Sequence, residues 1–459
     1  MRRLRHLAER TPADRERYVD LLRAVAITVV VLGHWTVAVI GYDPAGRPTG
    51  RSALPDLPWA YPLTWLAQVM PVFFVVGGFA NAASLAARRA RGGDAADWLL
   101  DRSARLIRPT TLLVLVLAVG ALLARVAGAD PSMIRTVAWF ATVPLWFLAA
   151  YLLVVPLTPL TYALHRRYGL AVPAALAALV GLGDLARATD HAVLANGNYL
   201  LGWLAVHQLG YAWYDARRET DPAQRRLPPT PRVGWALLLG GVAVLVLLTT
   251  VGPYPVSMLN VPGERLDNAA PPSLALLVLT TAQLGLIVVL RDRAERWLRR
   301  PGPWQAVIAV NAVVLTVFLW HLSAAILLVG GLDAVGLLPT PPAGSPAWLA
   351  WRVPWLLMLV VVLAALVAVF GRVEAGAGRS AGGPTGGGGA GGRLRGGSAA
   401  LGYGAVVAAL VVNAVTPKDA PEPLGLPVTA LVAYLAGAGL LRLLRHTAQH
   451  RRPRPGHLG

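Results

Sequence analysis

Apolar stretches long enough to cross a bilayer as helices recur along the whole chain of 459 residues. A spanning helix needs about 20 mainly apolar residues, and only helices or closed barrels satisfy the backbone polar groups within lipid. The composition, 56% hydrophobic and 14% charged, is too apolar for a soluble globular protein. We therefore predict an all-α, polytopic transmembrane helical bundle. The predicted spans are 19–41, 62–86, 109–128, 138–162, 170–187, 198–214, 233–252, 273–290, 304–330, 347–370, 400–415 and 425–444.

Basic residues are distributed unevenly between the loops that join these spans. The N-terminal arm, the C-terminal tail and every second loop together hold 33 of the 42 Lys and Arg residues. Because cytoplasmic loops carry an excess of Lys and Arg, we predict a multi-pass protein of the cytoplasmic (inner) membrane with both termini in the cytoplasm. A net charge of +19 would suggest nucleic-acid binding in a soluble protein. Here the loops account for the charge, so the expected partner is the lipid bilayer and no nucleic acid.

A Gly-rich stretch divides the chain near its C-terminal end. Residues 371–398 are mostly Gly with scattered Arg, Ala and Ser, a composition that cannot bury enough surface to fold. We predict a flexible cytoplasmic linker there. It would separate a working core of ten spans, residues 1–370, from an accessory transmembrane hairpin, 399–446, and a basic cytoplasmic tail, 447–459.

The first predicted span carries three ionisable residues, Asp20, Arg23 and His34. Arg23 and His34 are eleven residues apart, about three helical turns, so they share one face, and Asp20 lies one turn before Arg23. A histidine bonded to a neighbouring helix is the structural alternative for His34. Ionisable groups inside a membrane helix are costly, however, and usually mark a function. The three residues therefore indicate a buried polar pathway or a catalytic site.

Arg105 and Arg108 precede Pro109, which suits the first turn of a helix, at the expected cytoplasmic start of the third span. Their spacing places both guanidinium groups on one helix face. Topology alone explains arginines at such a boundary. A pair of guanidinium groups can also bind phosphates in bidentate geometry, so both interpretations stay open.

Four further residues within the spans are candidates for lining a site. His207 and His321 fall near mid-depth, where each alone fits a packed, hydrogen-bonded residue. Gly78, in the pair Gly77-Gly78, favours close helix packing, and Trp146 has no reactive group and indicates packing or positioning. No close spacing of His and carboxylate residues appears and the chain has no cysteine, so we predict no metal site.

Taken together, these motifs resemble the acyltransferase type 3 family, integral-membrane O-acyltransferases of bacteria and some eukaryotes, over about residues 14–370. Arg23 and His34 match the family's motif of arginine, ten residues and histidine, and Arg105 and Arg108 match its paired arginines. Residues 73–79 are similar to its aromatic-Ser-Gly segment, although Gly77 stands where the family commonly has Ser. The segments 146–148 and 320–322 are similar to later family motifs.

The resemblance implies transfer of an acyl group, often acetyl, from an acyl-CoA co-substrate to a hydroxyl, commonly on a sugar, with no bound cofactor. His34 would act as general base or carry the acyl group, with general base the favoured role, and Asp20 could pair with Arg23. Arg105 and Arg108 would bind the donor's phosphates. The acceptor would be a cell-envelope glycan or glycolipid. There are two alternatives: the acceptor could be a diffusible metabolite, or the protein could be a non-enzymatic transporter or flippase. The oligomeric state stays open.

Overall fold

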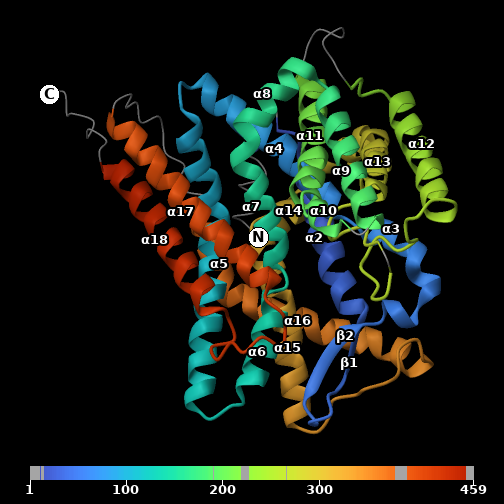
Figure 1. Cartoon of the computed structure of the whole chain (residues 1–459), viewed down its shortest axis with the longest axis vertical. Coiled ribbons are helices and arrows are strands. Elements are labelled where there is room, and N and C mark those ends of the chain that lie inside the picture. Colours follow the sequence, from blue (N-terminus) through green and yellow to red (C-terminus); the bar gives the residue numbers. More distant parts are fainter. Residues whose placement is uncertain are drawn as a thin grey trace. The chain divides into compact units, whose positions relative to one another are not determined.

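The computed structural model describes residue 11 and residues 15–189, 191–218, 227–264, 266–377 and 390–450 (Figure 1). These residues are almost entirely helical, with one two-stranded antiparallel sheet. Eleven segments among them are helical, long and apolar enough to cross a membrane. The prediction of an all-α polytopic bundle is therefore confirmed.

The chain forms two compact units, each built from separate stretches of sequence. Unit 1 comprises residues 1–83, 157–314 and 328–361, and unit 2 comprises residues 84–156, 315–327 and 362–459. The helices α4 (Met70–Ala90), α15 (Val314–Ala334) and α16 (Pro346–Ala377) contribute to both units. This division differs from the linear one expected from the Gly-rich stretch.

Unit 1 is built around the helix α11. The α11 residues are buried along almost the whole helix, and α8, α9 and α13 pack against it. Besides the shared helices, the elements of unit 1 are α2 (Arg17–Thr36), β1 (Ala38–Tyr42), β2 (Pro48–Ser52), η1 (Leu54–Asp56), η2 (Pro58–Leu63), α3 (Thr64–Ala67), α8 (Thr158–Tyr168), α9 (Ala171–Ala188), α10 (Ala192–Ala195), α11 (Asn198–Arg218), α12 (Pro231–Thr250), α13 (Leu274–Leu298) and α14 (Pro301–Asn311).

Unit 2 contains the two C-terminal helices together with earlier parts of the chain. Besides its shares of α4, α15 and α16, it holds α5 (Ala95–Val126), α6 (Pro131–Thr142), α7 (Leu145–Val154), η3 (Val155–Leu157, whose last residue belongs to unit 1), α17 (Ala390–Val415) and α18 (Val428–His450). The helix α17 packs on α18, α7 and α5, and α18 also packs on α5.

Local capping signals fix where two of the long helices begin. The carboxylate of Asp94 accepts a hydrogen bond from the Asp97 backbone N–H at the start of α5. The Ser273 hydroxyl likewise accepts from the Leu276 backbone N–H at the start of α13. Such side chains satisfy backbone donors that the first helical turn leaves without a partner.

The start of α5 corrects one expectation. Pro109 does not begin the helix but is buried within it, so Arg105 and Arg108 lie in the interior of α5 and not at its start. Capped by Asp94, the helix begins at Ala95, fourteen residues before the predicted span, and those residues are too polar for a membrane-spanning segment. The helix continues through Pro109 although the proline removes one backbone hydrogen bond.

At two of the predicted spans, a break moves the segment that can cross the membrane. Within 138–162, α6 ends at Thr142 and α7 begins at Leu145, and the spanning segment is Leu145–Tyr168. Within 304–330, α14 ends at Asn311 and α15 begins at Val314, and only Val314–Ala334 is long and apolar enough to cross. Pro144, at the N-cap of α7, lies at the first break, where its lack of a backbone N–H removes one helical hydrogen bond.

The sixth predicted span is a helix, α11, but it is not among the eleven segments apolar enough to cross. Polar residues such as Asn198, His207, Gln208 and Asp215 lower its hydropathy, and all four are buried. The helix thus depends on protein neighbours for burial.

Helices extend into both ends of the predicted linker. Helix α16 continues to Ala377 and α17 begins at Ala390, so both ends of 371–398 are helical. Residues 378–389 lie outside the described residues, as do 451–459 of the predicted basic tail and most of the N-terminal arm.

Hydrogen bonds with α6, α7 and α5 hold the C-terminal hairpin in unit 2. The Arg135 guanidinium, buried in α6, donates to the carbonyl oxygens of Gly425 (2.8 Å), Thr416 (2.9 Å) and Pro417 (2.6 Å) in the loop between α17 and α18. The Tyr403 hydroxyl donates to the Leu152 carbonyl oxygen in α7 at 2.6 Å. In the same way, the Tyr434 hydroxyl donates to the Ile107 carbonyl oxygen in α5 at 3.3 Å. The hairpin is therefore an integral part of unit 2.

The strands β1 and β2 form a hairpin directly after α2. They pair from Ala38 opposite Ser52 to Tyr42 opposite Pro48. The Asp43 carboxylate accepts from the backbone N–H groups of Arg47 and Ala45, both at 2.9 Å, which closes the turn. These hydrogen bonds, led by the one from Arg47, hold the pKa of Asp43 below its usual value. Beneath the hairpin lies a small apolar core of Val39, Ala53, Leu57 and Trp348.

Candidate active site

Asp20 and Arg23 form an ion pair near the beginning of α2. The Arg23 Nη1 atom donates to Asp20 Oδ1 at 3.1 Å, and Arg15 Nε donates to Asp20 Oδ2 at 2.8 Å. Asp20 is only 6% exposed, and its backbone carbonyl oxygen accepts from the Asn311 side chain at 2.9 Å. The predicted pairing of Asp20 with Arg23 is confirmed. Two cations compensate the buried carboxylate, which would otherwise be costly.

The start of α2 is anchored on the C-terminal end of α13. The backbone N–H of Tyr18 donates to the Glu295 carboxylate at 2.8 Å, which supplies the cap that Glu16 does not give. Arg17 donates to the Leu298 carbonyl oxygen at 2.8 Å. An anion at a helix N-terminus and a cation at a helix C-terminus both have favourable dipole interactions. The two helix ends therefore fix each other and, with them, the position of Asp20.

His34 lies in the last turn of α2, about 16 Å along the helix from Arg23. Its side chain is exposed. An exposed imidazole can meet a substrate.

The end of α2 is held by α16. Arg352 donates to the Ala38 carbonyl oxygen at 2.9 Å, and the indole N–H of Trp355 donates to the Trp35 carbonyl oxygen at 3.0 Å. Both carbonyl oxygens lie at or just beyond the end of α2, where no later helical N–H group can donate to them. The backbone that follows His34 is therefore fixed.

His207 is enclosed between α4 and α11. It is fully buried, and its Nε2 atom lies 3.0 Å from the Asn81 amide nitrogen in a hydrogen bond. At Gly78, an added Cβ atom would lie 2.1 Å from the His207 carbonyl oxygen, and Gly210 approaches the α4 backbone equally closely. The expected role of Gly78 in close helix packing is confirmed, and it is this contact that places His207 beside Asn81.

His321 and Trp146 belong to unit 2. His321 is fully buried, and its Nδ1 atom lies 2.6 Å from the Phe318 carbonyl oxygen one turn earlier. Trp146 is half-buried, and its neighbour Phe147 packs edge-on against Phe318 with ring centroids 5.5 Å apart. The structure thus brings the segments of Trp146 and His321 together through Phe147 and Phe318.

Arg105 and Arg108 are exposed on the surface of α5, also in unit 2. Because Pro109 has no backbone N–H, it cannot donate the usual helical hydrogen bond to the Arg105 carbonyl oxygen. Two exposed guanidinium groups one turn apart form a small cationic face. Such a face can bind phosphate groups.

A family model described as an acyltransferase domain matches residues 16–371. The chain belongs to the acyltransferase type 3 family. No curated protein and no solved structure matches it significantly. Membership identifies a membrane acyltransferase and sets aside the transporter or flippase alternative.

The matched region of this acyltransferase begins beside α2 and ends within α16. It contains Asp20, Arg23, His34, Arg105 and Arg108, whereas α17 and α18 lie beyond it. Among the described residues, no three His, Asp or Glu side chains gather as a metal site would require.

Sequence reasoning missed the residues that hold the candidate site in place. Asn81 binds His207, Asn311 binds the backbone of Asp20, and Arg352 binds the end of α2. The role of Asn81 could have been predicted, because Asn81 is an amide inside an apolar span. Polar side chains in such spans form hydrogen bonds between helices. The partners of the other two come from distant parts of the chain and carry no local signal.

Proposed function

We propose that this acyltransferase moves an acyl group, acetyl in the first instance, from acyl-CoA to a hydroxyl of a cell-envelope glycan or glycolipid. The observation that carries the proposal is His34: an exposed imidazole on the helix that also holds the Asp20–Arg23 pair. The family relationship supplies acyl transfer as the reaction class.

His34 is suited to the role of general base. The acceptor oxygen attacks the thioester carbonyl carbon, so that a C–O bond forms and the C–S bond breaks. The imidazole takes the hydroxyl proton and returns it to the departing thiolate, which leaves the histidine unchanged. Positioned proton transfer of this kind contributes about 10²–10⁴-fold to a rate.

The arginines are suited to the donor. Coenzyme A carries several phosphate oxygens, and the exposed pair Arg105 and Arg108 offers guanidinium groups for them. The role of Asp20 in this proposal is to fix the Arg23 side chain through their ion pair.

The distribution of basic residues supports a location in the cytoplasmic membrane with both termini inside. In that orientation Asp20 and Arg23 lie near the cytoplasmic face and His34 lies deeper, toward the outside. Acyl-CoA would arrive from the cytoplasm, and the acceptor would arrive from the outer side.

The proposal is tested by mass spectrometry of envelope glycans and extracted metabolites from a strain lacking the gene, complemented with wild type, His34→Ala or His191→Ala. His191 is an exposed histidine before α10 and serves as the matched control. We expect wild type and His191→Ala to add one acyl group to an envelope glycan, and His34→Ala to lose that product at equal protein level.

Two results would contradict the proposal. Full acylation by His34→Ala would remove the histidine from the chemistry. An acyl group found only on a diffusible metabolite would replace the envelope acceptor while leaving the acyltransferase reaction intact.

A further inference from the structure

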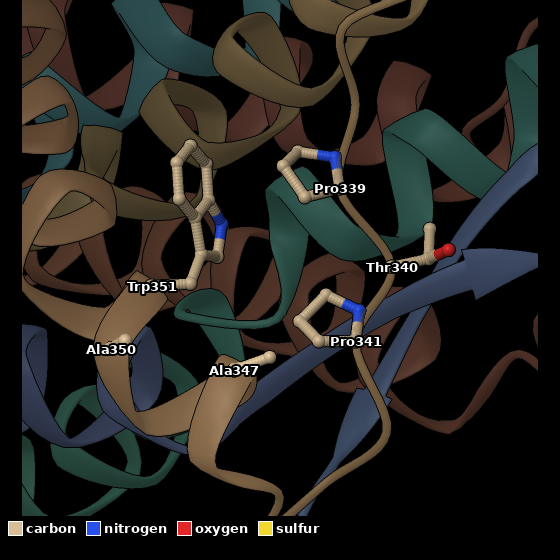
Figure 2. Close-up of a pocket in the computed structure, with 6 residues that line it drawn as sticks. All are labelled: Pro339, Thr340, Pro341, Ala347, Ala350 and Trp351. Carbon is tan, nitrogen blue, oxygen red and sulfur yellow. The ribbon is translucent and has the colours of Figure 1, made fainter.

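A surface hollow lies between the N-terminal part of α16 and the chain segment that precedes it. Its walls are Ala347, Ala350 and Trp351 on one side and Pro339, Thr340 and Pro341 on the other, and its volume is about 510 Å³. Figure 2 shows the indole of Trp351 facing the rings of Pro339 and Pro341 across the hollow. Flat rings on two sides leave a slot with apolar walls.

A second hollow, of about 570 Å³, adjoins the first through Thr340 and Pro341. Polar groups from the β-hairpin and η1 line it, including Thr49 and the ion pair of Arg51 with Asp56. Each hollow has a volume within the range of small-molecule sites. The two hollows share Thr340 and Pro341 in their walls, and we call the pair the Trp351 groove: one hollow carries rings and the other an ion pair.

The walls of the groove are held rigidly. The Tyr42 hydroxyl donates to the Asp333 carboxylate at 2.8 Å, which ties β1 to the C-terminal end of α15. Trp348 and Ala343 pack in the small apolar core beneath the hairpin. A preformed groove binds a ligand without the cost of ordering its own walls.

The groove is also connected to the helix of His34. Strand β1 begins at Ala38, four residues after His34, and forms part of the groove wall. Arg352, next to Trp351, binds the Ala38 carbonyl oxygen. Elements on both sides of the groove are therefore attached to the end of α2 at which His34 lies.

We propose that the Trp351 groove binds a sugar unit of the acceptor. This inference rests on the proposed function and adds the place and the chemistry by which the acceptor is recognised. A sugar ring presents an apolar C–H face, which stacks on an aromatic ring, and a rim of hydroxyls, which bind carboxylate and guanidinium groups. A lipid tail would match the slot but not the ion pair of Arg51 with Asp56.

The test uses the full-length purified protein in nanodiscs and measures saturable binding of three probes, maltotriose, mannotriose and triacetylchitotriose. The variants are Trp351→Ala, Trp351→Phe and Asp56→Asn, with Trp59→Ala as the matched control. Trp59 is 68% exposed and does not line the groove. Size-exclusion profiles check that each variant is folded.

We expect at least one probe to bind, about tenfold more weakly to Trp351→Ala and to Asp56→Asn, and nearly normally to Trp351→Phe and Trp59→Ala. Absence of binding by every probe, or equal effects of Trp351→Ala and Trp59→Ala, would overturn the inference. So would quenching of Trp351 fluorescence by brominated lipid, which would show that lipid fills the slot.

The variant His34→Ala separates this inference from the proposed function. We expect it to lose acyl transfer from acetyl-CoA and to keep saccharide binding. Saccharide binding that depends on Trp351, in a protein with no acyl transfer to any hydroxyl, would support the groove and refute the proposed reaction. Acyl transfer with an acceptor KM unchanged by Trp351→Ala would support the proposed reaction and refute the groove.

Discussion

The guanidinium of Arg352 binds the carbonyl oxygen of Ala38 at 2.9 Å, so a side chain near the start of α16 fixes the backbone just beyond α2. The two residues are 314 positions apart in the sequence. His34 lies one turn before this contact, and its backbone therefore depends on a residue from the other end of the matched domain.

Replacing Arg352 by Gln should loosen the end of α2. The variant loses a charged donor at carbonyl groups that have no helical partner, which should cost about 1–3 kcal/mol. A lower thermal unfolding midpoint in detergent checks this. Arg352→Lys keeps the charge and should lose less, and equal midpoints for wild type and Arg352→Gln would contradict the expectation.

Replacing Gly78 by Ala should push α4 away from α11. The added methyl group would lie 2.1 Å from the His207 carbonyl oxygen, and such overpacking costs about 1–3 kcal/mol. Gly240→Ala, in α12, is the matched control because nothing lies within 4 Å of its added Cβ atom. Unfolding in mixed micelles with rising SDS should distinguish the two, and equal stability of both variants would refute the close contact.

The His207–Asn81 pair should show coupling in a double-mutant cycle. Removing either side chain leaves the other buried next to a cavity, so the second removal should cost less than the first. We expect a coupling free energy of about 0.5–2 kcal/mol in the same SDS titration. Strict additivity of His207→Ala and Asn81→Ala would rule out a direct interaction.

Replacing Arg135 by Ala should release the loop between α17 and α18. The substitution removes the donor to three carbonyl oxygens at once. Amide hydrogen exchange over residues 416–425 should become faster, whereas Arg125→Ala, which alters an exposed arginine in α5, should leave it unchanged. Unchanged exchange in Arg135→Ala would mean that the loop is held by other contacts.

The sequence predicted what depends on neighbours along the chain. The Asp20–Arg23 pair follows from an i, i+3 spacing in one helix, and the spans follow from runs of apolar residues. The position of Gly78 in a close contact was also predictable, since small residues mark such contacts in membrane helices.

What escaped prediction depends on distant residues or on polar sequence. That Gly210 is the counterpart of Gly78 cannot be read from either segment alone. The true start of α5 at Ala95 was hidden because a polar, Arg-containing stretch precedes the apolar run. The sequence suggested that α11 is an ordinary span. Its polar residues are buried by neighbouring helices, and such burial leaves no periodic pattern in the sequence.

The packing of α18 on α5 has a consequence for how the protein is made. About 300 residues separate the end of α5 from the start of α18. At about 5–20 residues per second, a ribosome needs roughly 15–60 s to synthesise them. During that interval the hydrogen bonds of Ile107 and Thr111 with Tyr434, and of Arg135 with the loop between α17 and α18, cannot form. Unit 2 can therefore close only after α18 has been synthesised.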